Sequence, residues 1–315
     1  MRVVQAPRAS AILHNLLKSR EGIYPWLLPA NICPIVPITF LKAEIPFKFV
    51  DISPKTLHMD WAKTKALLKT QKFGGLLYAH TYGEPSVPYD FFSDVTKKHP
   101  ELIVVDDRCL CIPRLEADDL NPADVQLYST GYGKIVDLHF GGYAFMRDDI
   151  DYKNMSLPFS PNAYDEIEKL YKHALHLHSR FIYQDSDWLD TTSPMPAWDE
   201  YRHQIETQLA QALQHSSLLN AAYAEMIPAK IQFPRAYQDW RFNIRVENQK
   251  RILDAIFSAG LFASLHYASL AGILGDGVSG YANTLANEVV NLFNDYHFTL
   301  KQAEQVCQVV VENLQ

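Results

Sequence analysis

The sequence lacks the features that mark several classes of protein. Its 315 residues carry a formal net charge of −7, so it has no basic excess of the kind that binds nucleic acid or anionic membranes. The most apolar segment, residues 26–41, is interrupted by three prolines and is too short to span a bilayer. The first residues contain no long apolar run, so we expect no signal peptide.

Cysteine is also scarce. The four cysteines include no CxxC pair, and the one closely spaced pair has no neighbouring histidine or cysteine that would complete a zinc site. The sequence therefore predicts reduced thiols, no metal site and a cytoplasmic protein. The cysteines are Cys33, Cys109, Cys111 and Cys307.

The first half of the chain alternates helical and strand patterns. Residues 8–19 place apolar side chains at helical spacing, and residues 88–99 do the same. Three short runs rich in β-forming residues, at 47–52, 74–80 and 101–107, end in polar residues. This rhythm predicts a mostly parallel sheet flanked by helices, with functional side chains just past the carboxyl ends of the strands.

The pattern changes near residue 150. Residues 147–162 are polar and interrupted by proline, which predicts a boundary between domains at 1–150 and 151–315. The second domain reads as a smaller α+β domain. Its expected elements are helices at 163–183, 198–226 and 247–260, strands within 230–246 and 261–267, and a last helix with a capping box at Thr299 and Gln302.

A lysine in an unusual setting is the first candidate for chemistry. Lys134 stands between Gly133 and an apolar run, five residues after Ser129. Asp106 and Asp107 end the strand run at 101–107, so their carboxylates and Lys134 can meet above one sheet edge. A strand-end turn and a plain hairpin explain the same residues without any activity.

Together these residue types suggest pyridoxal phosphate chemistry. A lysine amine can hold the cofactor aldehyde covalently if its site is sheltered from water. A carboxylate must face the pyridine nitrogen to keep it protonated, and hydroxyl and amide groups must hold the phosphate.

Several segments, in order, resemble the DegT/DnrJ/StrS family of sugar aminotransferases. The resemblance covers most of the chain, and it rests on the order and spacing of the matching segments. The segments are LPANICPIV, LKAEIPFKFVDI, AHTYGEP, VVDDRC, STGYGK, the glycine pair at 141–142, WRFNIRVENQKRILDAIFSAGL, HY and VVNLFNDYHFTLKQAEQV.

This resemblance implies an α/β fold of the pyridoxal-phosphate-dependent transferase fold type I, with a mostly parallel central sheet. It implies that Lys134 anchors pyridoxal 5'-phosphate, that Asp107 pairs with the pyridinium and that Ser129 holds the phosphate. Cys33 falls where the family often places a side chain against the cofactor ring, although a small buried hydrophobic residue is an equal interpretation.

The sequence also departs from the family. The usual fifty or so residues before the phosphate-binding helix are absent, and Arg8 and Ser10 stand where the family has Gly-Thr or Ser-Gly. These two residues can replace the missing donors at the helix N-terminus, or Arg8 can be an ordinary surface residue. Leu110 replaces a Gln or His near the ring hydroxyl, and no Asn-Tyr-Arg stretch follows the glycine pair.

Other polar residues have two interpretations each. His80 ends a strand and can approach the cofactor or form a structural hydrogen bond. Arg241 and Arg245 can bind a substrate carboxylate or form ion pairs within the protein. The histidines His173, His176 and His178 are expected on a surface helix. His266 and Tyr267 are candidates for lining the cleft.

The resemblance implies an aminotransferase that moves an amino group from an amino acid, commonly glutamate in this family, to a nucleotide-linked keto sugar. It further implies a homodimer and a role in polysaccharide biosynthesis. The departures motivate a second hypothesis, a non-catalytic descendant that serves as a binding or scaffold protein. A sugar dehydratase is a third, against which Lys134 argues, because dehydratase relatives carry histidine there.

Overall fold

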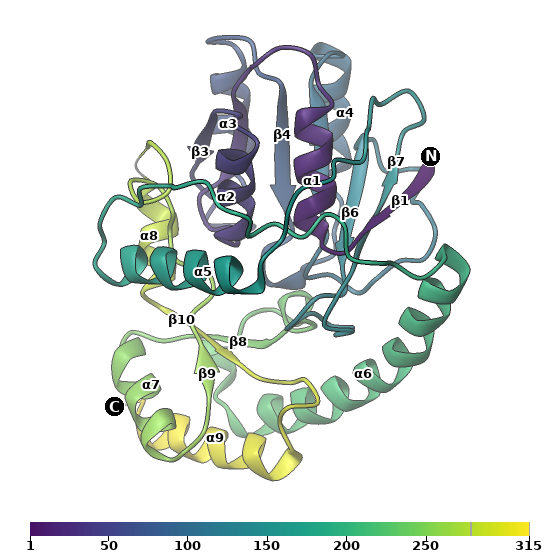
Figure 1. Cartoon of the computed structure of the whole chain (residues 1–315). Coiled ribbons are helices and arrows are strands. Elements are labelled where there is room, and N and C mark those ends of the chain that lie inside the picture. The colour runs from purple at the N-terminus through teal and green to yellow at the C-terminus, as the bar shows by residue number, and fades with distance from the viewer. Residues whose placement is uncertain (278, 315) are drawn as a thin grey trace.

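The computed structural model describes residues 1–277 and 279–314. It has a larger lobe built on a seven-stranded sheet and a smaller lobe built on a three-stranded sheet, with a long helix running along one side of both (Figure 1). No helix in the described part of the chain combines the length and apolarity that crossing a bilayer requires.

The larger sheet is mostly parallel, as predicted. Its strand order is β1-β7-β6-β5-β4-β2-β3, and only β7 runs against its neighbours β6 and β1. The parallel strands are short and almost wholly buried, as expected for a sheet covered on both faces. The strands are β1 (Arg2–Ala6), β2 (Trp26–Pro29), β3 (Phe47–Val50), β4 (Gly75–Ala79), β5 (Ile103–Asp107), β6 (Val125–Ser129) and β7 (Gly142–Met146).

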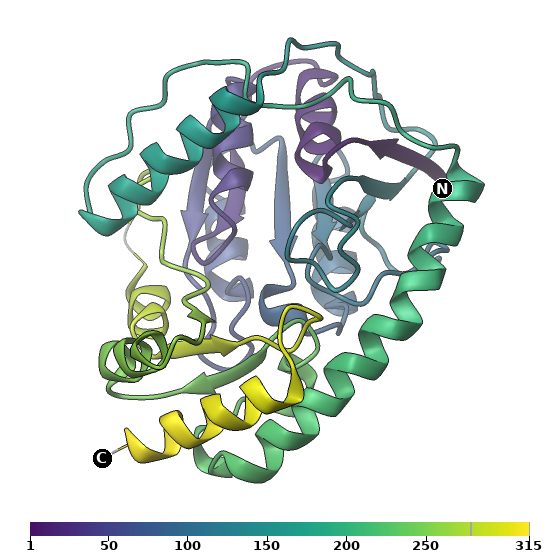
Figure 2. The same cartoon turned by 60° about the horizontal axis from the view of Figure 1, so that its bottom comes forward.

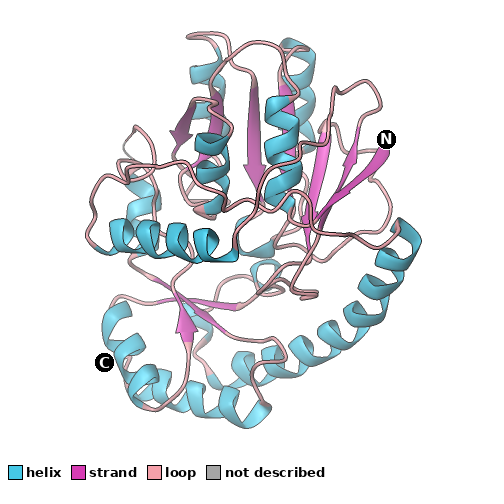
Figure 3. Ribbon diagram, viewed as in Figure 1, coloured by secondary structure: helices cyan, strands magenta, loops and turns pink. Residues whose placement is uncertain are grey.

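Two apolar layers sandwich this sheet. Alternate side chains of β4 point to opposite faces, so that Leu77 joins the layer under α1 and α2 while Leu76 and Tyr78 join the layer under α3 and α4. Figure 3 shows these helices flanking the sheet. The helices and the short 3-10 turn of this lobe are α1 (Ala9–Lys18), α2 (Ile35–Lys42), α3 (Trp61–Leu68), η1 (Thr81–Gly83) and α4 (Tyr89–Lys98).

The smaller lobe is an antiparallel sheet packed on helices. Its strand order is β8-β10-β9, and its core joins that sheet to α6, α7 and α9. Helices α6 and α9 lie side by side along this lobe (Figure 2). The elements after residue 150 are α5 (Pro161–His176), α6 (Trp198–Met226), η2 (Ala229–Ile231), η3 (Arg235–Tyr237), β8 (Phe242–Arg245), α7 (Gln249–Ser258), β9 (Ala263–Ser264), α8 (Gly280–Ala286), β10 (Val289–Leu292) and α9 (Leu300–Glu312).

The predicted boundary at residue 150 stays a prediction, and the chain returns to the larger core after that point. Ile167 and Ala174 of α5 are buried in the larger core, as is Trp188 beyond it. Tyr201, near the start of α6, packs against aromatic residues of β6 and β7. Side chains of α6 enter the core of the smaller lobe from Leu219 onward, in the last third of the helix.

Most local expectations are confirmed, and three need correction. The helix expected over 163–183 ends at His176 in α5, and His178 just beyond it adopts a left-handed φ of +48° that a helix does not continue through. The segment 230–246 was expected to be strands, but only β8 is one, because Pro228 and Pro234 introduce the turns η2 and η3. The strand expected at 261–267 shrinks to the two residues of β9. The capping box at Thr299 is present, with its hydroxyl accepting from the backbone of Gln302.

Candidate active site

A small pocket opens at the carboxyl ends of the parallel strands, where the sequence predicts function. It encloses about 30 Å³, which is room for one or two water molecules. The segments after β2, β4, β5 and β6 each contribute to its wall, together with one residue of the smaller lobe. The lining residues are Asn31, Ile32, Cys33, Ala79, His80, Thr81, Asp107, Cys109, Leu110, Lys134 and Tyr267.

Asp107 and Lys134 therefore share one pocket, as the sequence predicts. Asp107 is 8% exposed, and its carboxylate accepts one backbone hydrogen bond, from the Cys109 N–H at 3.0 Å. Burial raises the pKa of the Asp107 carboxyl, although the bonds from Cys109 and the charge of Lys134 act in the opposite direction. Among the described residues, no carboxylate lies within ion-pair distance of the Lys134 ammonium. The pocket thus contains the Asp107 carboxylate and the Lys134 amine, and these two groups form no direct ion pair with each other.

Lys134 lies on the loop that joins β6 to the antiparallel β7. Its backbone N–H donates to the Gly131 carbonyl at 3.3 Å, and Gly133 adopts a φ of +72°, which favours glycine. The Gly133 N–H donates to the buried Asp137 carboxylate at 2.8 Å. Its carbonyl accepts from the indole N–H of Trp240 at 2.8 Å. The glycine before the lysine is therefore needed for the shape of the loop.

A second polar cluster lies where α1 begins. Arg8 is the N-cap residue of α1, and Ser10 lies half-buried in the first turn of that helix. A side chain added at Gly131 would meet the Ser129 hydroxyl at 3.6 Å and Arg8 Nη1 at 3.7 Å, so all three residues approach one spot. A guanidinium, a hydroxyl and the N-terminal amides of a helix suit a phosphate group. The structure thus brings Arg8 and Ser129 together beside Gly131, and Ser10 lies two residues after Arg8 in the first turn of α1.

His80 borders the pocket, but its nitrogens serve the protein. Nδ1 lies 2.7 Å from the Glu84 carbonyl oxygen, and Nε2 lies 2.6 Å from Asp106 Oδ1. Both ring nitrogens therefore already have hydrogen-bond partners within the protein. The structural hydrogen bond, rather than a bond to a ligand, is the interpretation that this geometry favours.

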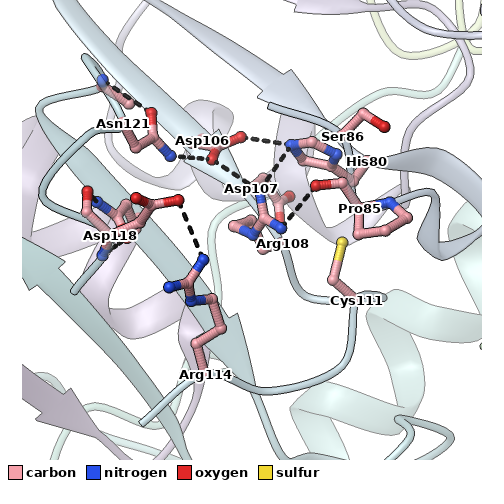
Figure 4. Close-up of polar contacts among 12 residues, drawn as sticks. His80, Pro85, Ser86, Asp106, Asp107, Arg108, Cys111, Arg114, Asp118 and Asn121 are labelled. Carbon is pink, nitrogen blue, oxygen red and sulfur yellow. Dashed lines mark hydrogen bonds and ion pairs between the residues drawn. The ribbon is translucent and has the colours of Figure 1, made fainter. Parts of the chain in front are cut away.

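Asp106 is the centre of a buried network that also fixes the end of β5 (Figure 4). It accepts from His80, from Arg108 Nη1 at 3.3 Å and from Asn121 Nδ2 at 2.7 Å. Burial alone would raise the pKa of Asp106, but His80, Arg108 and Asn121 together hold it below the ordinary value. The two adjacent aspartates therefore have opposite environments, since Asp106 is saturated with donors and Asp107 faces the pocket.

Apolar side chains and thiols fill much of the remaining space. Cys33 is half-buried against the pocket, and burial raises the pKa of its thiol while Lys134 acts against that rise. Leu110, Trp240 and Tyr267 form a small buried cluster on the side of the smaller lobe. The indole and phenol rings stack at 6.0 Å with 7° between their planes.

The candidate arginines and histidines outside the pocket fit the simpler interpretations. Arg241 is buried and pairs with Asp295 at 2.9 Å, whereas the half-exposed Arg245 pairs with Glu288. The three histidines on and after α5 are exposed.

A metal site is not supported by the one cluster that has ligand-type atoms. Within the described part of the chain, His58, His80 and Glu84 bring such atoms within 4.8 Å of one another. Burial lowers the pKa of His58 to about 3, so its imidazole is in the neutral form that can bind a metal, but it would need further ligands. Both nitrogens of His80 are already hydrogen-bonded, which leaves this cluster without a free set of ligands.

Comparison with solved structures gives a clear result for the fold. A DegT DnrJ EryC1 StrS aminotransferase from Brucella abortus matches with a TM-score of 0.69 and 13% identity, over 100% of this chain and 86% of that one. DesI, solved in the presence of its TDP-sugar product, matches with a TM-score of 0.73 and 15% identity, over 98% and 80%. PseC from Helicobacter pylori, an aminotransferase in pseudoaminic acid biosynthesis, matches with a TM-score of 0.70 and 13% identity, over 100% and 87%.

The chain has the fold of these aminotransferases. That fold is type I of the pyridoxal-phosphate-dependent enzymes, as the sequence predicts. At these identities the comparison concerns the fold, and the roles of individual residues rest on the geometry described above. No family model matches the sequence, and no curated protein matches it.

Proposed function

We propose that the protein binds pyridoxal 5'-phosphate in this pocket and transfers an amino group from an amino acid to a keto sugar. The observation that carries the proposal is that Lys134 and the buried Asp107 line one pocket, while Arg8 and Ser129 approach each other at the start of the loop that carries Lys134. This combination supplies an amine, a carboxylate and an anion site, which are the three groups that the cofactor needs.

The donor set fits the cofactor. The Asp107 carboxylate has a raised pKa because it is buried with few donors, and a protonated ring nitrogen would supply the missing donor. Arg8 forms no ion pair with any described residue, so its charge is available to a phosphate. The pocket encloses about 30 Å³, which is too little for an aromatic ring, so side chains of its lining must shift when a ring enters.

The roles of the residues follow from their chemistry. Pyridoxal phosphate, when bound, supplies an electron sink for the carbon that loses a proton. Lys134 would anchor it through Nζ, and the freed Nζ would then carry the proton that the donor amino acid gives up. Asp107 would hold the ring nitrogen protonated, and Arg8, Ser10 and Ser129 would fix the phosphate. Cys33 would lie against the ring.

The substrate class is supported by resemblance. DesI was solved in the presence of its TDP-sugar product, and PseC is an aminotransferase involved in the biosynthesis of pseudoaminic acid. We therefore infer a keto sugar as the acceptor, linked to a nucleotide, with glutamate as the donor. A homodimer in the cytoplasm and a role in polysaccharide synthesis belong to the same proposal.

One observation favours a second function. Leu110 and the stacked pair of Trp240 and Tyr267 leave little free volume beside Lys134. If these side chains do not move, the protein is a binding or scaffold protein that retains the fold without the reaction.

Donor deamination separates the two functions. The purified protein would be mixed with pyridoxal phosphate and single amino acids, beginning with L-glutamate, and the keto acid released in one turnover would be counted. An aminotransferase gives about one keto acid per site. Lys134→Ala should slow the release by roughly 10²- to 10⁴-fold, since it removes the proton carrier.

The matched control is Lys172→Ala, which removes an exposed lysine of α5 that pairs with Glu168 at 3.0 Å. Equal keto acid release by the wild type and Lys134→Ala would contradict the proposed role of Lys134. Cofactor binding with no keto acid from any donor would favour the binding protein.

A further inference from the structure

The residue before the candidate catalytic lysine is held at both of its backbone polar groups. The Gly133 N–H donates to Asp137 Oδ2 at 2.8 Å, and the Gly133 carbonyl accepts from Trp240 Nε1 at 2.8 Å. Asp137 is 7% exposed and also accepts from the His139 N–H at 2.9 Å, so its carboxylate is itself fixed. These bonds leave the backbone on the N-terminal side of Lys134 little freedom.

The two partners of Gly133 belong to different parts of the protein. Asp137 lies on the same loop as Lys134, next to the larger core. Trp240 lies just before β8, in the smaller lobe, and is separated from Gly133 by 107 positions in the sequence. The indole therefore links the lysine loop to the smaller lobe.

Trp240 is wedged tightly between the lobes. Its ring stacks on Tyr267 and packs with Leu110 and, more loosely, with Ile135, the residue after Lys134. On the side of the larger lobe, a side chain at Gly83 would meet Trp240 Cβ at 3.2 Å, and Gly83 has a φ of +79°. The backbone of Trp240 thus sits against a turn that only glycine suits.

We propose that Trp240 is a positioning residue for Lys134 and that its indole N–H transmits movement of the smaller lobe to the lysine loop. The proposal rests on the proposed function, because it assumes that Lys134 carries the chemistry. When the smaller lobe moves toward or away from the sheet edge, the bond to Gly133 pulls the residue next to Lys134 with it. The position of the amine is then set by whether the two lobes are together.

If Trp240 only filled space, replacing it with another aromatic residue would leave the lysine loop unchanged. Phenylalanine keeps an aromatic ring that can stack on Tyr267 but has no N–H to donate. Trp240→Phe therefore removes the link and keeps most of the packing. The matched control is Trp61→Phe, which removes an indole from α3, where Trp61 stacks on Phe91 and does not line the pocket.

The first test is hydrogen–deuterium exchange of the cofactor-free protein, followed in the peptide that covers residues 129–138. Loss of one hydrogen bond should speed exchange in this peptide roughly three- to ten-fold in Trp240→Phe, and not in Trp61→Phe. In the wild type labelled with ¹⁵N-tryptophan, the Trp240 indole N–H should exchange slowly with solvent. This second measurement remains decisive if Trp240→Phe does not fold.

The second test is kinetic. With the cofactor-loaded protein, Trp240→Phe should lower kcat roughly three- to ten-fold and leave the KM of the amino donor unchanged. Unchanged exchange of the loop peptide, or rapid exchange of the indole N–H, would overturn the link. A loosened loop with an unchanged kcat would overturn the positioning role. Absence of any turnover in the wild type would instead count against the proposed function, and the exchange result would still decide the link.

Discussion

Asp107→Asn offers a test in which stability and cofactor binding should change in opposite directions. The buried carboxylate of Asp107 has a single backbone donor, and its pKa is raised by burial. Asparagine has nearly the same shape and keeps an oxygen that can accept from the Cys109 N–H. A buried polar group without adequate partners costs about 1–3 kcal/mol. Removing the charge should therefore stabilise the cofactor-free protein and raise its Tm by about 2–4 °C.

The effect has a defined pH dependence. The pKa of Asp107 is higher in the folded state than in the unfolded state, so the ionised carboxylate lowers the free energy of unfolding at pH values above the folded-state pKa. This destabilisation disappears as the pH falls through the folded-state pKa. The Tm advantage of Asp107→Asn should be largest near pH 7–8 and should shrink toward pH 4.

The assay is thermal unfolding by differential scanning fluorimetry from pH 4 to pH 8, with and without pyridoxal phosphate. The control is Asp119→Asn, at an exposed acid on the loop between β5 and β6. Added cofactor should raise the Tm of the wild type by mass action and that of Asp107→Asn much less. A lower Tm for cofactor-free Asp107→Asn at pH 7.5, or an equal response of both proteins to the cofactor, would refute the reasoning.

Two further predictions concern the surroundings of the site. Asp106→Asn should destabilise the protein by about 3–5 kcal/mol in urea unfolding, since it leaves the buried Arg108 guanidinium without its carboxylate. Because the pKa of Asp106 is lowered in the fold, this difference should be full at neutral pH and decline as the pH falls below about 4, and a stability loss that is the same at pH 3 and pH 7 would contradict it. Arg8→Ala should weaken binding of pyridoxal phosphate roughly 10- to 100-fold in an equilibrium titration, and binding of pyridoxal, which has no phosphate, much less. Arg20→Ala is its surface control, and an equal loss for both ligands would count against a phosphate site at Arg8.

Much of the larger lobe can be read from the sequence because its parallel strands are continuous apolar runs. The runs that end at Asp107 and at His80 are bounded by polar residues, so β4 and β5 and the site beyond them are predictable. Strand β1 is harder to predict, because Arg2 and Gln5 interrupt a run of only five residues. Its pairing with the distant β7, rather than its local sequence, makes it a strand.

The same contrast holds at the site. Lys134 and Ser129 lie on one strand–loop unit and Asp107 ends the neighbouring strand, so their placement at one sheet edge is predictable, and the resemblance to sugar aminotransferases implies their roles. The burial of Arg108 cannot be predicted from the sequence, because a charged residue is expected at the surface unless it has a buried partner. Its partners, the Asp106 carboxylate and the Pro85 carbonyl, are identified only in the folded structure. The contact between Trp240 and the lysine loop likewise has no local signal in the sequence.

The central claim is that Lys134 holds pyridoxal phosphate. The most direct measurement is borohydride reduction of the purified protein mixed with pyridoxal phosphate, followed by mapping of the modified peptides by mass spectrometry. We expect one reduced pyridoxyl group per chain, on Lys134, with the other lysines of the chain unmodified at equal cofactor and protein concentrations. No adduct on Lys134 under saturating cofactor would contradict the account and leave the protein a binding module on an aminotransferase fold.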